Sequence, residues 1–306
     1  MPVRAETLLR QPSLAAKMLA AGETIATGAR SEAGDVPELP EVETIARGLA
    51  NAISGRTIDD ATVALRKVVA PEPERFVRAL RGETVEGVGR RGKFVVVRLG
   101  SGQQLAVHLR MTGRLIVQPA GTREPEPYTT VLLTFRDGLR LCFADVRQFG
   151  RMRLFGPEEP WAADIGVEPL SGDFSFERFS SLLDGRTTPI KVFLLDQRRI
   201  AGIGNIYACE ALWEARIRPT TPAGTLSRQA RQRLHQSIGS VLRHAVEMRG
   251  TSVDDYVDAE GLRGGFQNEL KVYGRDGLGC ARCARPIVRT VLAQRGTWWC
   301  RACQRR

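Results

Sequence analysis

The stretch PELPEVET, residues 37–44, marks the point where an Ala-, Gly- and Thr-rich segment gives way to a helical pattern. Pro40 suits the first turn of a helix, where an amide hydrogen is not needed. Gly55 can end this helix. Between them, apolar residues follow at helical spacing and predict one buried face: Val42, Ile45, Leu49 and Ile53. By itself, the stretch predicts only an acidic helix start.

Residues 57–155 carry short β-type runs separated by turn signals such as Asp137-Gly138. These runs predict an antiparallel sandwich, and prolines at 157, 160 and 169 mark a linker after it. The runs are Phe94–Val97, Leu105–Leu109, Arg114–Val117, Val131–Phe135 and Leu139–Phe143.

The second half of the chain turns helical and then cysteine-rich. The candidate helices are Phe176–Leu183, Lys191–Gln197, Asn205–Glu214 and Ser227–Met248. We therefore expect an α+β fold of five segments. These are an extension (1–36), a β-sandwich with its helix (37–156), a linker (157–172), a helical unit ending in a Gly- and Asp-rich loop (173–268), and a cysteine-bearing segment (269–306).

The charge balance indicates a polyanionic partner. The formal net charge is +11 and the pI is about 10.0, and such proteins usually bind nucleic acid. On charge alone, a basic protein with no particular partner is as good an interpretation. Residues 271–306 hold nine basic groups against the single acid Asp276. No run of 18 apolar residues and no secretory signal occurs, so we expect a cytoplasmic protein without a membrane span.

Four of the six cysteines form two CxxC pairs, which suit a tetrahedral zinc site. Sixteen residues separate the pairs, which are Cys280 with Cys283 and Cys300 with Cys303. Strand-like Ile287–Gln294 and Thr297–Trp299 predict a hairpin with Arg295 at its tip. We expect one structural zinc ion; a redox or iron–sulfur role is the alternative. Cys142 and Cys209 are most simply buried thiols.

The stretch AGIGNIYA, residues 201–208, places two glycines before a helix that starts near Asn205. Helix N-termini bind phosphate through free N–H groups and the helix dipole. An ordinary helix-entry turn has the same pattern, so the stretch is weak evidence alone.

Taken together, the motifs resemble the formamidopyrimidine-DNA glycosylase family over residues 37–306. The agreement covers PELPEVET, RRGK (90–93), HLRMTG (108–113), DVRQFG (145–150), IKVFLLDQ (190–197), AGIGNIYA and QRGTWWC (294–300), in the family's order. The resemblance implies a catalytic helix before the sandwich, a helix–two-turn–helix domain with the zinc finger, and double-stranded DNA in a basic cleft between them. It also implies a monomer, working in base-excision repair in the bacterial cytoplasm at the nucleoid.

The resemblance implies a catalytic set led by Pro37. Its amine would attack C1′ of an oxidised purine nucleotide, form a Schiff base and cut the strand by β,δ-elimination. Glu38 would donate a proton to the opening sugar, and Glu41 would orient the helix or the Pro37 amine. Lys93 would contact phosphate beside the lesion and assist elimination, and Arg295 completes the set.

The resemblance further implies the DNA contacts. Met111, Arg147 and Phe149 would fill the gap left by the flipped base. Lys191, Arg186, Asn205 and Arg295 would grip phosphates around it. The loop 251–266 would close over the extruded base, and its length favours purine lesions.

Three residues depart from the family's pattern: Gln148 replaces an Arg, Arg110 a Gly, and Tyr128 a histidine. A larger departure is that Pro37 is internal, so its nitrogen is an amide without a usable lone pair. We hypothesise that translation starts at residue 36, where a GTG codon would be read as Val36. The alternatives are an endonuclease VIII-type enzyme for oxidised pyrimidines, a non-catalytic binder of lesions or abasic sites, and a zinc-dependent nucleic-acid module of another function.

Overall fold

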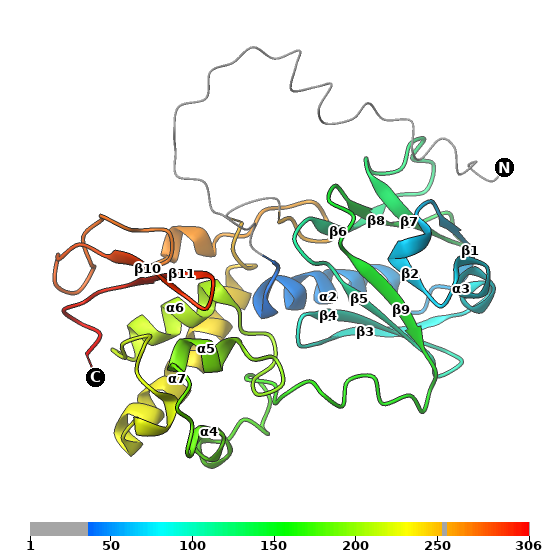
Figure 1. Cartoon of the computed structure of the whole chain (residues 1–306). Coiled ribbons are helices and arrows are strands. Elements are labelled where there is room, and N and C mark those ends of the chain that lie inside the picture. Colours follow the sequence, from blue (N-terminus) through cyan, green and yellow to red (C-terminus); the bar gives the residue numbers. More distant parts are fainter. Residues whose placement is uncertain (1–35, 253–255, 306) are drawn as a thin grey trace, which may run out of the picture.

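The computed structural model describes residues 36–252 and 256–305. The extension 1–35 and part of the expected capping loop, residues 253–255, lie outside the described residues. Figure 1 shows two lobes, one built on β-sheets and one mostly helical, joined by an extended linker. This arrangement confirms the α+β prediction.

Helix α2 (Leu39–Ile53) runs from the junction of the lobes into the sheet lobe (Figure 1). Its apolar stripe is fully buried, as the helical spacing predicted. Glu38 is the N-cap, and Ser54 ends the helix by donating its N–H to Ala50.

Two sheets form the N-terminal lobe. The five-stranded sheet has the order β2-β9-β5-β4-β3 and the four-stranded sheet the order β1-β7-β8-β6. The first is built from β2 (Val69–Ala70), β9 (Arg151–Phe155), β5 (Gln104–His108), β4 (Phe94–Leu99) and β3 (Val85–Arg91). The second is built from β1 (Ile58–Val63), β7 (Thr129–Phe135), β8 (Arg140–Asp145) and β6 (Gly113–Gln118). Side chains of both sheets and of α2 share one core.

A short helix, α3 (Pro73–Leu80), interrupts the region that we expected to be mostly strand. Pro73 opens it, and Phe76 and Leu80 bury one face at i and i+4. Two buried residues are too few for a clear periodic signal, which is why the sequence did not reveal this helix.

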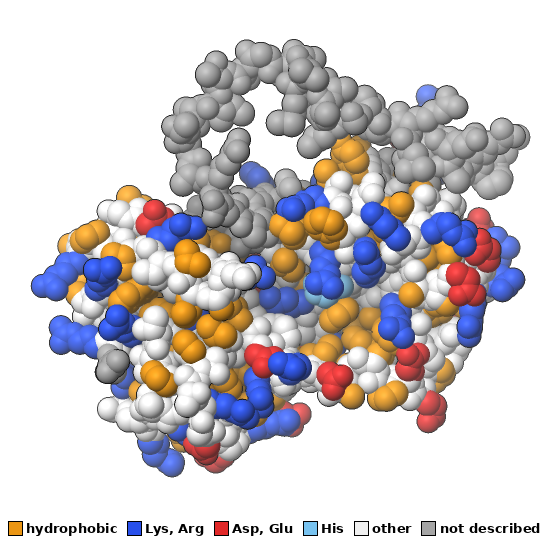
Figure 2. Space-filling view, viewed as in Figure 1, with side chains coloured by type: hydrophobic (Ala, Val, Ile, Leu, Met, Phe, Trp, Pro, Cys, Tyr) orange, Lys and Arg blue, Asp and Glu red, His pale blue; other side chains and the backbone are white. Residues whose placement is uncertain are grey.

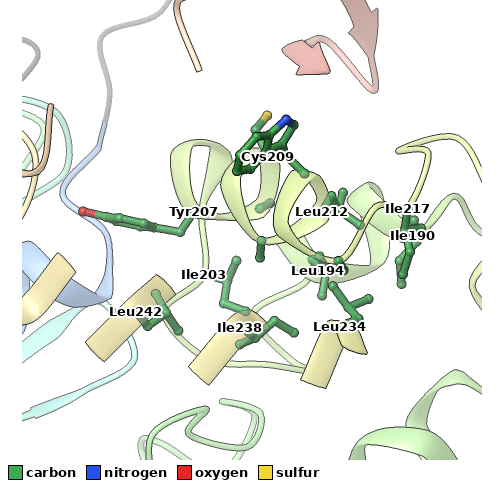
Figure 3. Close-up of a cluster of buried hydrophobic side chains, with 14 of the residues drawn as sticks. Ile190, Leu194, Ile203, Tyr207, Cys209, Leu212, Ile217, Leu234, Ile238 and Leu242 are labelled. Carbon is green, nitrogen blue, oxygen red and sulfur yellow. The ribbon is translucent and has the colours of Figure 1, made fainter. Parts of the chain in front are cut away.

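The C-terminal lobe packs four helices around one core. They are α4 (Phe176–Leu183), α5 (Ile190–Leu195), α6 (Asn205–Glu214) and α7 (Arg228–Glu247), with short turns η3 (Ala223–Thr225) and η4 (Phe266–Glu269). Ser175 and Ser227 cap α4 and α7 with their side chains. Figure 3 shows Leu194 of α5 beside Leu234 of α7 in this core, and Ile203 beside Ile238. Among the described residues, no helix is long and apolar enough to cross a membrane.

The cysteine-bearing segment forms the predicted hairpin, but with a different turn. Strands β10 (Val288–Leu292) and β11 (Arg295–Trp299) pair Leu292 with Arg295. Ala293 and Gln294 form the turn, with φ of 48° and 60°. Our prediction that Arg295-Gly296 would be the tip was wrong by two residues. Two positive φ angles are typical of a type I′ hairpin turn, and Ala-Gln is not a typical sequence for it.

Candidate active site

The start of helix α2 docks directly onto the glycine loop before α6. The Leu39 N–H donates to Gly202 O at 3.0 Å. The Glu38 carboxylate accepts from the N–H groups of Gly204 (2.7 Å) and Ile206 (2.9 Å). The anion at this helix N-terminus is therefore the chain's own carboxylate, which brings the two lobes together at Pro37-Glu38.

Both glycines of this loop are needed for the close approach. Gly202 has φ +82°, and a Cβ on it would lie 2.7 Å from Leu39 Cβ. A Cβ on Gly204 would lie 2.4 Å from Glu38 Oε1 and 2.6 Å from Lys93 Nζ. The Glu38 carboxylate and the Lys93 ammonium therefore converge on Gly204, next to the buried Pro37.

Lys93 reaches this point from the β3–β4 turn, which Glu168 of the linker fastens. The partly buried Glu168 carboxylate accepts from Gly92 N at 2.7 Å and Arg91 Nη1 at 2.8 Å. Arg90 Nη1 forms an ion pair with it at 2.7 Å. Burial alone would raise the pKa of Glu168, but these arginines and the Gly92 N–H lower it overall. The linker therefore positions the turn that carries Lys93, and no local pattern in the sequence indicates this long-range contact.

Glu41 binds three segments together in a buried position. Its carboxylate accepts from Glu38 N at 2.9 Å, from Thr251 N at 2.7 Å, and from the Tyr207 hydroxyl. Burial raises its pKa, although each of these bonds lowers it. Glu41 thus fixes the start of α2 against α6 and the base of the loop 251–266.

The three residues expected to fill the DNA stack lie on two adjacent loops of the sheet lobe. Met111 is on the β5–β6 loop, and Arg147 and Phe149 are on the β8–β9 loop. Phe149 is 48% exposed, and the Arg147 guanidinium lies 5.2 Å from its ring centre. A phenylalanine this exposed contributes little to the core of the protein, and such a side chain can insert between stacked bases of DNA.

Asp145 joins these two loops. One oxygen accepts from Thr112 Oγ1 and from Arg147 N at 3.1 Å, and the other accepts from Gly150 N at 2.7 Å. Asp145 is 2% exposed, so it acts as a buried bracket under the wedge residues.

His108 is a site residue that sequence reasoning did not single out. Its Nδ1 accepts from Arg110 N at 3.0 Å, and its ring meets Phe94 edge-on at 4.7 Å. Burial, followed by the charges of Arg110 and Lys93, lowers its pKa to about 3. His108 is therefore neutral beside the Lys93 ammonium. In the sequence, only its place in the HLRMTG motif indicated that it belongs to the site.

The expected phosphate-gripping residues occupy different environments. Lys191 is 0% exposed, and its ammonium donates to Gly296 O and Thr297 Oγ1, each at 2.7 Å. Asn205 begins α6, and its Oδ1 is buried without a hydrogen-bond partner among the described residues. Arg295 is exposed at the start of β11. Arg186 lies apart, on the α4–α5 connection against Gly224.

The three departures from the family's pattern share a backbone feature. Arg110, Tyr128 and Gln148 have φ of 56°, 63° and 59°. Non-glycine residues rarely adopt this region of backbone conformation. The backbone at position 110 is therefore strained with arginine and would be unstrained with the family's glycine. All three lie on loops that connect strands of the sheet lobe, and none lies on the β3–β4 turn that carries Lys93.

The four patterned cysteines fit a single zinc ion. Their sulfur atoms lie within 4.8 Å of one another, with Cys280–Cys303 at 3.9 Å and Cys283–Cys300 at 3.5 Å. Zn–S bonds of 2.3 Å in a tetrahedron place sulfurs about 3.8 Å apart. All four positions are protein thiols, so the zinc is structural and holds the β10–β11 hairpin.

Figure 2 shows that Lys and Arg side chains outnumber Asp and Glu on the face around the junction of the lobes. Such a face attracts a polyanion.

Comparisons with known proteins agree along the chain. Family profiles match residues 36–152 (formamidopyrimidine-DNA glycosylase N-terminal domain), 165–257 (formamidopyrimidine-DNA glycosylase H2TH domain) and 277–306 (zinc finger found in FPG and IleRS). The formamidopyrimidine-DNA glycosylases of Heliobacterium modesticaldum and Roseiflexus sp. are 44% and 45% identical over 277 and 274 residues. Each alignment covers 88% of this chain and 100% of the relative.

Solved structures show the same fold. A Lactococcus lactis Fpg variant in complex with Fapy-dG-containing DNA has a TM-score of 0.83 at 36% identity, and covers 88% of this chain and 100% of its own. The same enzyme with abasic-site DNA scores 0.82 at 35% identity, with the same coverage. The Thermus thermophilus MutM structure scores 0.79 at 39% identity, covering 88% and 98%. With three matching domains and relatives of this identity, the chain belongs to the formamidopyrimidine-DNA glycosylase family of DNA repair enzymes.

Proposed function

We propose that the protein removes oxidised purines, such as 8-oxoguanine and formamidopyrimidines, from double-stranded DNA and then cuts the abasic strand. The observation that carries this proposal is the convergence of the Glu38 carboxylate and the Lys93 ammonium on Gly204, beside Pro37. An acid–base carboxylate and a phosphate-binding cation next to an amine suit covalent excision followed by elimination.

In the proposed reaction, the Pro37 amine attacks C1′ and the C1′–N bond to the base breaks. Opening of the sugar, with Glu38 donating a proton to its ring oxygen, leaves an iminium between C1′ and the proline nitrogen. Loss of a C2′ proton then breaks the C3′–O bond, and a second elimination breaks the C5′–O bond. An α-amino group has a reference pKa of about 7.7–8, so a useful fraction is neutral near pH 7.

This chemistry requires Pro37 to be the first residue. Its nitrogen is otherwise an amide and cannot form an iminium. We propose that translation starts at residue 36, or that the extension is removed. The family profile beginning at residue 36 and the full coverage of relatives by 88% of this chain support this part of the proposal.

The surrounding residues fit supporting roles. Met111, Arg147 and Phe149 would enter the gap in the base stack, held by the Asp145 bracket. Asn205 and Arg295 would contact phosphates directly. Lys191, whose ammonium is bonded to the hairpin, would contribute by holding the finger in place. The loop 251–266, tied at its base to Glu41, would cover the extruded base. The bacterial cytoplasm, with the nucleoid as target, is the expected location.

The test compares the 1–306 protein with a protein beginning at Pro37. Each is incubated with duplex DNA carrying 8-oxoguanine opposite cytosine, and borohydride is added to reduce any iminium to a stable protein–DNA adduct. We expect adduct and cleavage from the Pro37 protein alone. Adduct from both would contradict the requirement for a free Pro37.

A parallel duplex with thymine glycol separates the alternatives. A solved relative, the Lactococcus lactis Fpg, is described with DNA containing an oxidised pyrimidine, so this arm is needed. Faster cutting of thymine glycol would favour a pyrimidine enzyme. Tight binding of abasic-site DNA without adduct from either protein would favour a non-catalytic binder.

A further inference from the structure

The second part of the loop 251–266 is built into the sheet lobe. We call residues 256–266 the strap. Ala259 of the strap is 2% exposed and belongs to the same core as helix α2 and the two sheets. Its carbonyl oxygen accepts a hydrogen bond from Val117 N, on the edge strand β6, at 3.1 Å. The chain therefore crosses from the helical lobe to the sheet lobe here, far from the linker in sequence.

Helix α2 provides a socket for Ala259 at Gly48. A Cβ on Gly48 would lie 3.2 Å from the Cβ of Ala259, closer than an ordinary contact between carbon atoms. Gly48 lies inside α2, where glycine destabilises a helix relative to alanine. The close approach of Ala259 accounts for a glycine at this position.

Asp258 folds the tip of the strap and ties it to Arg249, which follows the end of α7. Asp258 is buried, with 2% of the residue exposed. One carboxylate oxygen accepts from Glu260 N at 2.9 Å and from Leu262 N at 3.0 Å. The other accepts from Arg249 Nε at 3.0 Å and from Arg249 Nη2. Hydrogen bonds between a guanidinium and a carboxylate are among the stronger ones in proteins, so Arg249 holds the tip in a defined place.

The base of the strap is fastened to the helical lobe. Gly265 N donates to Met248 O at 2.8 Å, and Phe266 N donates to Gly250 O at 3.0 Å. A Cβ on Gly264 would lie 2.3 Å from Gly250 O, so the two segments of chain meet through their backbones. The strap is thus fixed to the helical lobe at its base and to the sheet lobe at its tip.

Ser252 connects the strap to the limb of the loop that leaves α7. Its hydroxyl accepts from Gly264 N and donates to Tyr256 O, each at 2.9 Å. The neighbouring Thr251 N donates to the Glu41 carboxylate of the candidate site at 2.7 Å. A displacement of the strap is therefore transmitted to the limb of the loop that begins at the site.

We infer that Asp258 and Arg249 are positioning residues for excision of the base, and that Ala259 in its socket anchors the strap that they hold. The inference rests on the proposed glycosylase function, in which the loop 251–266 covers the extruded base. Asp258 acts through the loop, because its carboxylate is occupied by the tip and by Arg249. A loop that is already held in place covers the base without first losing conformational freedom. An abasic site offers no base to cover, so the strap should affect base excision far more than cutting of an abasic strand.

The ion pair between Arg249 and Asp258 is tested in the protein beginning at Pro37. D258N keeps one oxygen for the N–H groups of the tip but places an NH2 group against the guanidinium. R249M removes the guanidinium, and R249K keeps the charge. R66M is the matched control, because Arg66 forms an ion pair with Glu74 at 2.6 Å on the surface of the sheet lobe. Single-turnover rates are measured for release of 8-oxoguanine and for cutting of a duplex with a ready-made abasic site.

The socket is tested by G48A, A259G and the double variant G48A/A259G. The methyl group of G48A would press on Ala259, while alanine favours the helix, so the melting temperature should not fall. A259G leaves the socket empty. In the double variant, the methyl group of residue 48 enters the space that the side chain of residue 259 has vacated. Melting temperatures show that each variant is folded at the assay temperature.

We expect D258N and R249M to slow base release about tenfold relative to abasic-site cutting, the change expected from loss of one charge-assisted hydrogen bond. R249K should recover part of this loss, and G48A/A259G should release the base faster than G48A. The inference is overturned if base release and abasic-site cutting change by the same factor in D258N and R249M. It is equally overturned if G48A behaves as R66M does, or if G48A/A259G is as slow as G48A. Absence of base release by the unchanged protein would overturn the proposed function, and this inference with it.

Discussion

Gly204→Ala adds one methyl group at the point where the two lobes meet, and we expect it to abolish most cleavage. The new Cβ would lie 2.3 Å from Glu38 Cδ and 2.6 Å from Lys93 Nζ. Ordinary carbon–carbon contact is about 3.5 Å or more, so the Glu38 carboxylate must move by about 1 Å. A displacement of this size at reacting groups costs about 100-fold in rate.

The backbone itself tolerates this change, because Gly204 has φ −127°. We therefore expect a loss of only about 1–3 kcal/mol in the free energy of unfolding, typical of overpacking. Gly156→Ala is the matched control, since a Cβ there has no neighbour within 4 Å. Both changes are made in the protein beginning at Pro37.

The assay is single-turnover cleavage of 8-oxoguanine duplex at saturating enzyme, well below the melting temperature of each variant. Duplex with a ready-made abasic site is tested in parallel, so that elimination is measured without base excision. The reasoning is refuted if G204A cuts within threefold of the rate of G156A. It is also refuted if G204A fails only because it does not bind abasic-analogue DNA.

Three further outcomes follow from the site. Lys191→Met should weaken binding of abasic-analogue DNA about tenfold in an equilibrium titration, because the hairpin loses a charge-assisted hydrogen bond of about 1.5 kcal/mol. The melting temperature should change little, because the substitution also removes a buried charge. His108 has a lowered pKa in the folded protein, so between pH 6.5 and about 3 the unfolded state binds a proton that the folded state does not. The neutral His108 side chain therefore contributes fully to the free energy of unfolding above pH 6.5, and this contribution is lost as the pH falls below 6.5. The free energy of unfolding, measured by urea titration between pH 7 and 5, should therefore fall less steeply in His108→Asn, by up to about 1.4 kcal/mol per pH unit. Cys283→Ser, or zinc chelation, should unfold the finger and abolish strand cutting, and cleavage unchanged after verified zinc loss would contradict this.

The elements that the sequence predicted well are those whose signals are local. Helix α2 has a proline start and one apolar stripe, and the zinc site is set by the spacing of four cysteines. The structure bears out both. Helix α3 has only two buried residues, and the hairpin turn uses Ala293 and Gln294 at positive φ without the usual Asn or Gly. Tertiary packing decides these two features, so local patterns do not reveal them.

The candidate site was predictable as a set of motifs but not as a geometry. Nothing in PELPEVET or AGIGNIYA shows that the Glu38 carboxylate binds the N–H of Gly204, 166 residues away. The buried state of Lys191 is equally invisible, because a lysine in a sequence is normally read as exposed. Its bonds to Gly296 and Thr297 cross more than 100 residues. The first contact exists only where the two lobes meet, and the second only where the hairpin packs against the helices of the C-terminal lobe.

Four buried carboxylates of this basic chain hold its loops in place and do not contribute to the charge of its surface. Glu38, Glu41 and Glu210 are buried, and each accepts backbone N–H groups of a distant segment. Asp145 is also buried, and it accepts the backbone N–H groups of Arg147 and Gly150 in the loop that follows it. Buried carboxylates of this kind do not form ion pairs with the arginines on the surface. Changing any of the four to its amide would make the net charge more positive, the direction that favours DNA binding. We nevertheless expect weaker repair from each change. The amide keeps one accepting oxygen but replaces the other with an NH2 group, so at least one N–H group loses its partner and the loops that hold the site would move.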